Sequence, residues 1–328
     1  MKIQKLFNQM DRLGKKGEPF LFIIDFEAVN PMLYALKDLP STIRYSTPGH
    51  PEIRDSSAVQ GPVTFERSPM SYPEYLQAFR IVHHHLHQGN SYLVNLTFPT
   101  PVHTSLSLQE IFSRSLAPYR LLVEDQFVVF SPEPFVTICD GMIRSFPMKG
   151  TIDASEPDAR EKVLSDPKES AEHNTIVDLI RNDLSRVASS VTVKRFRYID
   201  RIRTLDREIL QVSSEIEGKL EPDYNSRLGR IFKELLPAGS VSGAPKKRTL
   251  EIIRDAEGSP RGYYTGVFGI FDGNSLESAV MIRFIERSAG GFQFRSGGGI
   301  THLSDPEKEY EEMVTKAYLD GRRTTDDR

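Results

Sequence analysis

The chain has 328 residues, of which 38% are hydrophobic and 27% are charged, and its formal net charge is −3. These values exclude a disordered chain, and the charge argues against a nucleic-acid-binding protein, which needs a dominantly basic surface. The single cysteine, Cys139, leaves no disulfide framework and no cysteine-based zinc site.

The beginning of the chain carries no apolar stretch typical of a signal peptide, and no apolar run approaches the roughly 20 residues of a membrane span. We therefore expect a cytoplasmic protein. Residues 1–65 are weakly patterned and interrupted by proline, which is typical of an edge elaboration. We expect one catalytic domain over residues 1–328, with residues 1–65 as its short N-terminal elaboration.

Strands are predicted where short apolar or alternating runs are bounded by turn residues. In chain order these runs cover residues 20–26, 91–98, 121–139, 262–273 and 277–300. The run at 121–139 contains Pro132 and Pro134, so it should form two strands around a corner. Asp272-Gly273 and the glycine pair at 290–291 are typical of hairpin turns.

Helices are predicted between these strands from apolar residues at helical spacing. They cover residues 71–89, 169–188, 225–237, 243–258 and 305–323. Ser71 and Glu74 have the spacing of a capping box, and Pro245 stands where a helix opens. Hairpins mixed with helices predict an α+β protein built on antiparallel sheets.

The last predicted helix carries Glu309, Glu312 and Lys316 on one face. Two carboxylates and a cation could hold Mg²⁺ and a substrate carboxylate. The same spacing is common on solvated acidic faces, and by itself it favours that plainer interpretation. The glycines Gly297 to Gly299 precede this helix, and they form either a flexible hairpin end or a turn whose bare N–H groups meet an anion.

Two further carboxylates and a lysine stand in unusual settings. Glu172 lies early in a predicted helix, where it either complements the helix dipole or supplies a third ligand to the same metal. Glu133 stands between two prolines that fix its backbone, which suits general acid/base work or a simple edge-strand corner. Lys149 ends an apolar strand, where it either snorkels to the surface or acts as an amine kept neutral by burial.

Histidine and cysteine give weaker signals. His83 and His87 are four residues apart on a predicted helix, but nothing near them in sequence supplies further metal ligands, so a polar helix end is the better interpretation. Cys139 follows an apolar strand and lacks the setting of a nucleophile, so we expect a packed strand residue.

Eight stretches together resemble the chorismate-utilising enzymes, which include anthranilate synthase component I, aminodeoxychorismate synthase component I, and the isochorismate and salicylate synthases. They follow the family's order: GNSYLVNLT, SPEPF, MKGTI, AEHNTIVDLIRNDLSRV, GSVSGAPKKRTLEII, RGYYTGVFGIF, MIRF and GGGITHLSDPEKEYEEMVTKA. The resemblance implies two antiparallel sheets packed face to face with helices on the outside. It also implies Mg²⁺ and chorismate as ligands.

The resemblance implies roles for individual carboxylates. Glu172 and Glu312 match the Mg²⁺ ligands of the family, with Glu309 beside them. The metal would hold the ring carboxylate of chorismate. Glu133 matches the acid/base that works at the departing C4 hydroxyl.

The same resemblance assigns contacts to the substrate. Arg283, Tyr264 and Lys316 match positions that bind the enolpyruvyl carboxylate of chorismate. The remaining expected contacts are Gly297, Gly298, Gly299, Thr151 and Gln211.

Lys149 points to one branch of the family. Aminodeoxychorismate synthases resemble this chain in having lysine in that motif, where it attacks C2 of the ring and holds a covalent adduct until ammonia adds at C4. Anthranilate synthases generally carry alanine, and the isochorismate and salicylate branch has a lysine base where this chain has Leu93. We therefore expect amination of chorismate to 4-amino-4-deoxychorismate, toward p-aminobenzoate and folate. A separate glutamine amidotransferase subunit would supply the ammonia.

Two residues depart from the pattern of the amine-forming members. Leu93 would usually be glutamine there, and Gln211 replaces a histidine near C4. Glutamine can hydrogen-bond the leaving hydroxyl but cannot protonate it, so Glu133 would carry more of the proton transfer. The alternatives are anthranilate synthase component I and a degenerate, non-catalytic chorismate-binding subunit.

Overall fold

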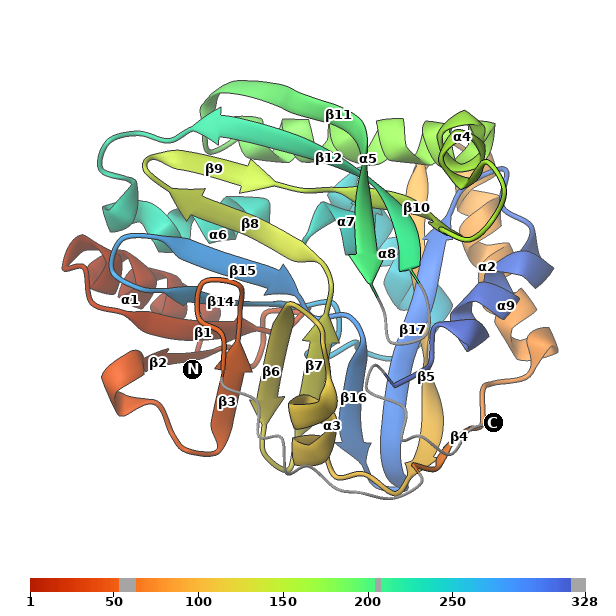
Figure 1. Ribbon diagram of the computed structural model, residues 1–328, viewed down its shortest axis with the longest axis horizontal. Helices are drawn as coiled ribbons and strands as arrows, with labels where there is room; N and C mark the ends of the chain where they lie inside the picture. Colours follow the sequence, from red (N-terminus) through yellow and green to blue (C-terminus); the bar gives the residue numbers. More distant parts are fainter. Residues whose placement is uncertain (53–62, 204–207, 320–328) are drawn as a thin grey trace. The chain divides into compact units, whose positions relative to one another are not determined.

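The computed structural model describes residues 1–52, 63–203 and 208–319, and the chain divides into two compact units (Figure 1). The first unit comprises Met1–Leu39, Glu133–Ser240 and Gly266–Val280, and the second comprises Pro40–Pro132, Val241–Thr265 and Met281–Arg328. Each unit contains one antiparallel sheet with its own helices, so the predicted α+β class with two antiparallel sheets is confirmed. The face-to-face packing and the single catalytic domain stay predictions.

The sheet of the first unit has nine strands in the described residues, in the order β10-β12-β9-β8-β15-β14-β1-β2, with β11 also paired to β12. Its strands are β1 (Phe20–Ile24), β2 (Met32–Ala35), β8 (Pro134–Cys139), β9 (Met142–Ser145), β10 (Met148–Asp153), β11 (Ser189–Arg203), β12 (Glu208–Lys219), β14 (Val267–Phe271) and β15 (Leu276–Val280). Its helices are α1 (Ile3–Lys15), α4 (Ala159–Ser165), α5 (Pro167–Ser185) and α6 (Leu228–Leu235), with the 3-10 turns η1 (Leu36–Asp38) and η2 (Tyr224–Arg227). Helix α5 packs against β10, β11 and β12.

The sheet of the second unit has eight strands in the described residues, in the order β13-β5-β17-β16-β7-β6-β3, with β4 also paired to β5. Its strands are β3 (Ile43–Ser46), β4 (Phe65–Arg67), β5 (Leu93–Thr104), β6 (Tyr119–Val123), β7 (Phe127–Ser131), β13 (Gly243–Ala244), β16 (Phe284–Ser288) and β17 (Gly291–Ile300). Its helices are α2 (Tyr72–His87), α3 (Leu108–Arg114), α8 (Lys246–Glu257) and α9 (Pro306–Thr315). The single turn α7 (Gly239–Ser242) spans the point where the chain passes from the first unit to the second.

Local sequence signals account for many of these elements. The apolar run of β1 is buried at all five residues, because the strand lies between β14 and β2. The capping box of Ser71 and Glu74 begins α2. Both predicted hairpins are present, between β14 and β15 and between β16 and β17.

Three expectations need correction or refinement. Residues 121–139 form parts of three strands rather than two, because β6 and β7 make a hairpin before the proline corner. Helix α9 ends at Thr315, so the helix predicted through 323 is wrong for residues 316–319, and residues 320–323 lie outside the described part. Residues 1–65 contribute strands to both sheets rather than only to an edge: β1 lies inside the first, and β3 pairs with β6 in the second.

Strand β10 is irregular at the residues that carry Lys149. Its pairing register with β12 shifts between Met148 and Thr151. Gly150 lies at this shift with a φ of +83°, a backbone conformation that glycine adopts without strain. A bulge of this kind changes the direction of the neighbouring side chains, so the Lys-Gly pair determines where Lys149 points.

Gly150→Ala should lower the free energy of unfolding by about 2 kcal/mol or more, since left-handed backbone costs alanine roughly 1–2 kcal/mol. The added methyl would also lie 3.3 Å from Glu169 Oε2 and 3.4 Å from Val163 Cγ2. Gly258→Ala is the matched control, because its φ is +66° and nothing lies within 4 Å of the new methyl. Urea denaturation compares the two variants. Equal losses of unfolding free energy in both would contradict the crowding of the new methyl group at position 150.

His173 joins α5 to the sheet beneath it. The imidazole is fully buried, its Nε2 lies 2.7 Å from Ser214 Oγ on β12, and its Nδ1 has no hydrogen-bond partner among the described residues. Burial lowers the pKa of His173 to about 4, and the positive charges of Arg197 and Lys149 act in the same direction. The folded protein therefore holds this histidine neutral at pH 7.

The free energy of unfolding should fall by on the order of 2–3 kcal/mol as the pH drops from about 6.5 to about 4 because of His173. In this window the unfolded chain binds a proton at His173 and the folded chain does not. Denaturation at a series of pH values in EDTA would measure this dependence, which His173→Gln should reduce. The same substitution at the exposed His103 is the control, and an unchanged pH dependence in His173→Gln would contradict the assignment.

Candidate active site

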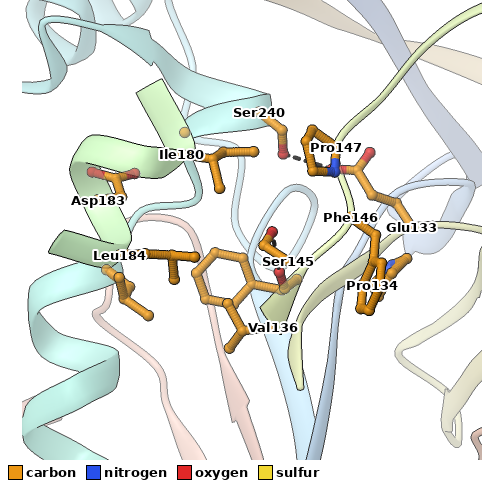
Figure 2. A pocket seen from close by; sticks show the side chains of 13 residues that line it. Glu133, Pro134, Val136, Ser145, Phe146, Pro147, Ile180, Asp183, Leu184 and Ser240 are labelled. Carbon is orange, nitrogen blue, oxygen red and sulfur yellow. Dashed lines mark hydrogen bonds between the residues drawn. The ribbon is translucent and has the colours of Figure 1, made fainter. Parts of the chain in front are cut away.

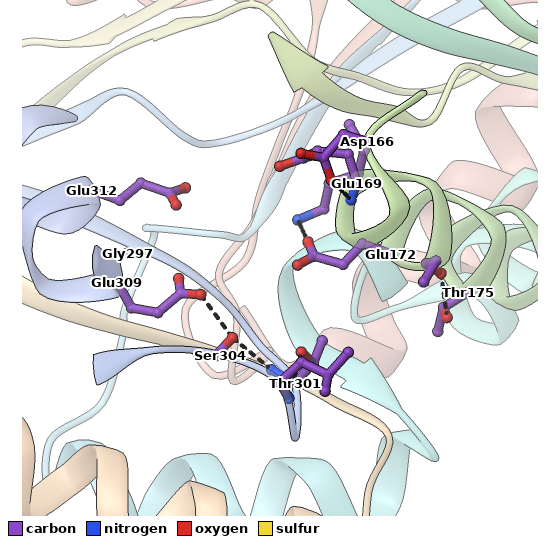
Figure 3. A network of polar contacts seen from close by, with 12 residues as sticks. Asp166, Glu169, Glu172, Thr175, Gly297, Thr301, Ser304, Glu309 and Glu312 are labelled. Atoms are coloured by element: carbon purple, nitrogen blue, oxygen red, sulfur yellow. Dashed lines mark hydrogen bonds and ion pairs between the residues drawn. The ribbon is translucent and has the colours of Figure 1, made fainter. Parts of the chain in front are cut away.

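Lys149 forms an ion pair with Glu172 of α5 within the first unit (Figure 3). Its Nζ lies 3.0 Å from Glu172 Oε2, and the exposed fractions of the two side chains are 26% and 8%. A carboxylate at this distance favours the ammonium form of the lysine. In this arrangement the lysine is partly exposed and paired with a carboxylate, and its role as a neutral amine stays a prediction.

Glu169 is a candidate site residue that the sequence interpretation missed. It lies one turn before Glu172 on α5, and its Oε2 would be 3.3 Å from a methyl group placed on Gly150. Figure 3 shows Glu169 and Glu172 on the same helix. The signal was present in the sequence, because Glu169 and Glu172 repeat the spacing of Glu309 and Glu312.

Helix α9 of the second unit presents the other carboxylate pair. Glu309 is only 3% exposed, and its Oε1 accepts a hydrogen bond from Ser304 Oγ at 2.7 Å (Figure 3). Glu312 lies one turn later, and its Oε1 is 2.5 Å from Lys316 Nζ. Lys316 also donates to the Gly297 carbonyl oxygen at 3.0 Å. The plain Glu–Lys pair is thus present, although one neighbouring carboxylate is buried rather than solvated.

The three glycines before α9 lie in a strand, so the predicted turn is wrong. Gly297, Gly298 and Gly299 belong to β17 and pair with Thr97, Leu96 and Asn95 of β5. A methyl group on Gly297 would lie 2.1 Å from the Leu96 carbonyl oxygen of β5, so the strands approach too closely there for any side chain. A methyl group on Gly298 would instead lie 3.2 Å from Glu309 Oε2, so Gly298 allows the strand to approach the carboxylates.

Arg283 and Tyr264 also belong to the second unit. The Arg283 guanidinium lies 5.0 Å from the ring centre of Tyr318, and its backbone has a φ of +51°. Tyr264 is 4% exposed, and burial raises its pKa to about 12. The phenol therefore stays protonated at neutral pH, when it can donate a hydrogen bond to an anion.

Arg261 fixes the segment that carries Tyr264, and the sequence interpretation did not single it out. Its guanidinium forms a buried bidentate pair with Glu257 at 2.6 and 2.9 Å. It also donates to the carbonyl oxygens of Val241 and Asn95. The bidentate pair therefore connects three chain segments of the second unit.

The remaining expected site residues of the first unit have defined neighbours. Glu133 Oε1 accepts a hydrogen bond from Ser240 Oγ at 2.6 Å. Gln211 lies on β12, and its Nε2 donates to the Gly150 carbonyl oxygen at 3.2 Å, next to Lys149. Thr151 pairs with Gln211 through the backbone, and its side chain lies outside what the structure describes.

Four other residues that the sequence singled out have defined positions in the structure. Leu93 is 2% exposed and belongs to the core of the second unit. Cys139 is exposed, so the expectation of a packed residue is wrong. The Nε2 atoms of His83 and His87 lie 3.2 Å apart on the surface of α2.

The carboxylate pairs suit a hard divalent cation, which prefers oxygen ligands. Within the described ranges, no group of three or more His, Cys, Asp or Glu residues is arranged to hold a metal ion. The carboxylate pairs are Glu169 and Glu172 in the first unit, and Glu309 and Glu312 in the second. None of the helices in that part of the chain is long and apolar enough to cross a membrane.

Comparison with known proteins identifies the family. Over 318 residues the chain is 50% identical to a protein of Haemophilus influenzae named an uncharacterized PabA-like protein, with 97% of both chains covered. It is 33% identical to an anthranilate synthase component 1 of Haloarcula marismortui, over 83% of this chain and 58% of that protein. It is 30% identical to aminodeoxychorismate synthase component 1 of Bacillus subtilis, over 76% of this chain and 55% of that protein.

A solved structure shares the fold. MenF, the menaquinone-specific isochorismate synthase of Escherichia coli, aligns with a TM-score of 0.70 over 96% of this chain and 80% of that chain, at 18% identity. The family model described as chorismate binding enzyme matches residues 33–319. This match spans most of the sequence, and the chain belongs to the chorismate binding enzyme family.

Proposed function

We propose that this protein aminates chorismate at C4 with ammonia, forming 4-amino-4-deoxychorismate and water, the first committed step toward p-aminobenzoate and folate. The observation that carries the proposal is Lys149, which the bulge at Gly150 presents beside Glu172. Family membership supports chorismate as the substrate. The similarity to an aminodeoxychorismate synthase component 1 supports the product.

The proposed reaction passes through a covalent adduct on Lys149. A bond forms between Lys149 Nζ and ring C2, the two ring double bonds shift, and the C4 hydroxyl leaves as water with a proton from Glu133. Ammonia then bonds to C4, the double bonds shift back, and Lys149 leaves C2. The nitrogen at C4 releases one proton to solvent, and Glu133 takes one proton up from solvent. The net change replaces the C4 hydroxyl of chorismate with an amine and returns both residues to their initial states.

Lys149 has to lose a proton before it can act as the nucleophile. In the proposed mechanism, the contact with Glu172 stabilises the ammonium form of Lys149 in the absence of ligands. Lys149 then loses its proton once Glu172 binds the metal cation instead. We propose Glu172, Glu309 and Glu312 as Mg²⁺ ligands, with Glu169 as a further candidate. A bound Mg²⁺ would neutralise the ring carboxylate of chorismate. Arg283, Tyr264 and Lys316 would bind the enolpyruvyl carboxylate.

The ammonia source is proposed to be a separate glutamine amidotransferase subunit. The single cysteine of this chain, Cys139, lies exposed at the end of β8, where its hydrogen bond to Asp140 raises the pKa of the thiol. This environment opposes a thiolate nucleophile of the kind that a glutaminase needs. A high concentration of an ammonium salt should therefore support the reaction without a partner.

Mass spectrometry of the products decides between the related reactions. With chorismate, Mg²⁺ and ammonium chloride, we expect 4-amino-4-deoxychorismate, and its formation should stop when ammonium is omitted. The similarity to an anthranilate synthase component 1 makes that enzyme the second candidate. Release of anthranilate and pyruvate would establish it instead, and chorismate binding without turnover would establish a non-catalytic subunit.

Lys149→Ala should lower the rate of aminodeoxychorismate formation at least about 100-fold, because it removes the proposed nucleophile. Intact-protein mass spectrometry of the wild type, quenched after incubation with chorismate and Mg²⁺ but without ammonium, should detect the adduct on Lys149. The exposed Lys162 supplies the control as Lys162→Ala, which should keep normal turnover. Unchanged turnover in Lys149→Ala would refute the covalent route.

Glu312→Gln should weaken Mg²⁺ binding at least about tenfold, because it removes one charged oxygen ligand. Isothermal titration of the protein with MgCl₂, without chorismate, measures binding independently of activity. Glu311→Gln is the control, because Glu311 is an exposed neighbour on the same helix. Equal affinities for both variants would exclude Glu312 as a ligand.

A further inference from the structure

A small cavity adjoins Glu133 inside the first unit (Figure 2). Its volume is about 20 Å³, and its walls come from β8, β9, α5, α6 and the segment around α7. Most lining side chains are apolar, such as those of Phe135, Ile180 and Leu235. Four polar side chains also line it: Glu133, Ser145, Asp183 and Ser240. A site of this size, with a few polar groups, accommodates one water molecule, which requires about 10–15 Å³.

Ser240 connects the cavity to Glu133. Its hydroxyl donates to Glu133 Oε1 at 2.6 Å, which is short for a hydroxyl–carboxylate hydrogen bond and typical of one to a charged acceptor. The position of Ser240 is set by Gly239, which lies so close to α5 that an added methyl would be 2.9 Å from Leu179 Cδ2. Close packing of α7 on α5 thus holds the hydroxyl in place.

Asp183 lies on the α5 side of the same cavity, whereas Glu133 and Ser240 lie together at another part of the wall (Figure 2). A methyl on Gly239 would be 3.1 Å from Asp183 Oδ2, so this carboxylate is adjacent to the residue that precedes Ser240. Asp183 is partly exposed. The other hydroxyl in the wall, that of Ser145, donates to the Phe135 carbonyl oxygen at 3.0 Å. Glu133, Ser240 and Asp183 therefore place two carboxylates and a hydroxyl in an otherwise largely apolar wall.

We propose that Ser240 is a positioning residue for Glu133, and that one water molecule in this cavity connects Glu133 to Asp183 as a path for protons. The inference rests on the proposed function, in which Glu133 gives a proton to the departing C4 hydroxyl. Glu133 then regains a proton from the cavity water, which takes one from Asp183, and Asp183 recovers it from solvent. The proton count is unchanged after each cycle.

The hydroxyl of Ser240 stabilises the ionised form of Glu133, so its removal should make Glu133 a weaker acid. In Ser240→Ala we expect the pKa of Glu133 to rise by about one unit. Carbon-13 NMR of the glutamate carboxyl groups measures this, with Glu133→Gln used to assign the signal. Ser145→Ala is the matched control, because it removes a hydroxyl from the same cavity that does not contact Glu133. Equal titration of Glu133 in the wild type and Ser240→Ala would overturn the positioning role.

Turnover supplies the second readout. Ser240→Ala should lower kcat about tenfold and shift the pH profile of kcat to higher pH, while KM for chorismate stays unchanged. Ser240→Thr keeps the hydroxyl, so it should show the wild-type pH profile. Asp183→Asn should also lower kcat about tenfold, with a larger solvent deuterium isotope effect. A wild-type kcat in Asp183→Asn, or a crystal structure at high resolution with an empty cavity, would overturn the proton path.

The two proposals can fail separately. The NMR titration uses the protein without chorismate or metal, so it tests the contact of Ser240 with Glu133 even if the wild type forms no aminodeoxychorismate. If the wild type forms the product and Ser240→Ala matches it in both the titration and the pH profile, only the role of Ser240 is refuted. Thermal unfolding of each variant establishes that it is folded.

Discussion

The ion pair between Lys149 and Glu172 is the contact around which the candidate chemistry of the first unit is arranged. It depends on two local features that come from different parts of the sequence. The bulge of β10 at Gly150 sets the direction of Lys149, and packing of α5 on the sheet brings Glu172 to it. The buried Glu172 requires a compensating charge, because an unpaired ion in a protein interior is strongly destabilising. The pair therefore provides the buried Glu172 with an opposite charge inside the first unit.

The same requirement applies to the buried Glu309 of the second unit, which accepts a hydrogen bond from Ser304. Buried carboxylates are costly, and apolar residues of similar volume are often as stable or more so. Their presence on α5 and α9, each beside a second glutamate at the same spacing, is better explained by a ligand that they bind than by stability. This reasoning supports the proposed cation, and it separates these pairs from the solvated Glu–Lys pairs found elsewhere on the surface.

Hydrogen bonds and a buried ion pair hold residues of the candidate site in fixed positions. In the second unit, the buried Arg261–Glu257 pair connects the loop of Tyr264 to β5 and to the segment of Val241. In the first unit, Ser240 fixes the carboxylate of Glu133, which follows the proline corner. In both cases a polar side chain is oriented by hydrogen bonds from segments distant in sequence, and such support is what preorganises a site.

Sequence alone determined the element types, the antiparallel hairpins and the motifs that identify the family, because these depend on periodicity, turn residues and short ordered stretches. It also singled out Glu133, Lys149, Glu172, Glu309 and Glu312 as candidate site residues, whose roles stay predictions. Only the tertiary structure decided that Gly297 to Gly299 form part of a strand, since that depends on pairing with β5, about two hundred residues earlier in the chain. Likewise the pairing of Lys149 with Glu172 and the contact of Ser240 with Glu133 follow from long-range packing, because the environment of a side chain is set by the segments that the fold brings alongside it.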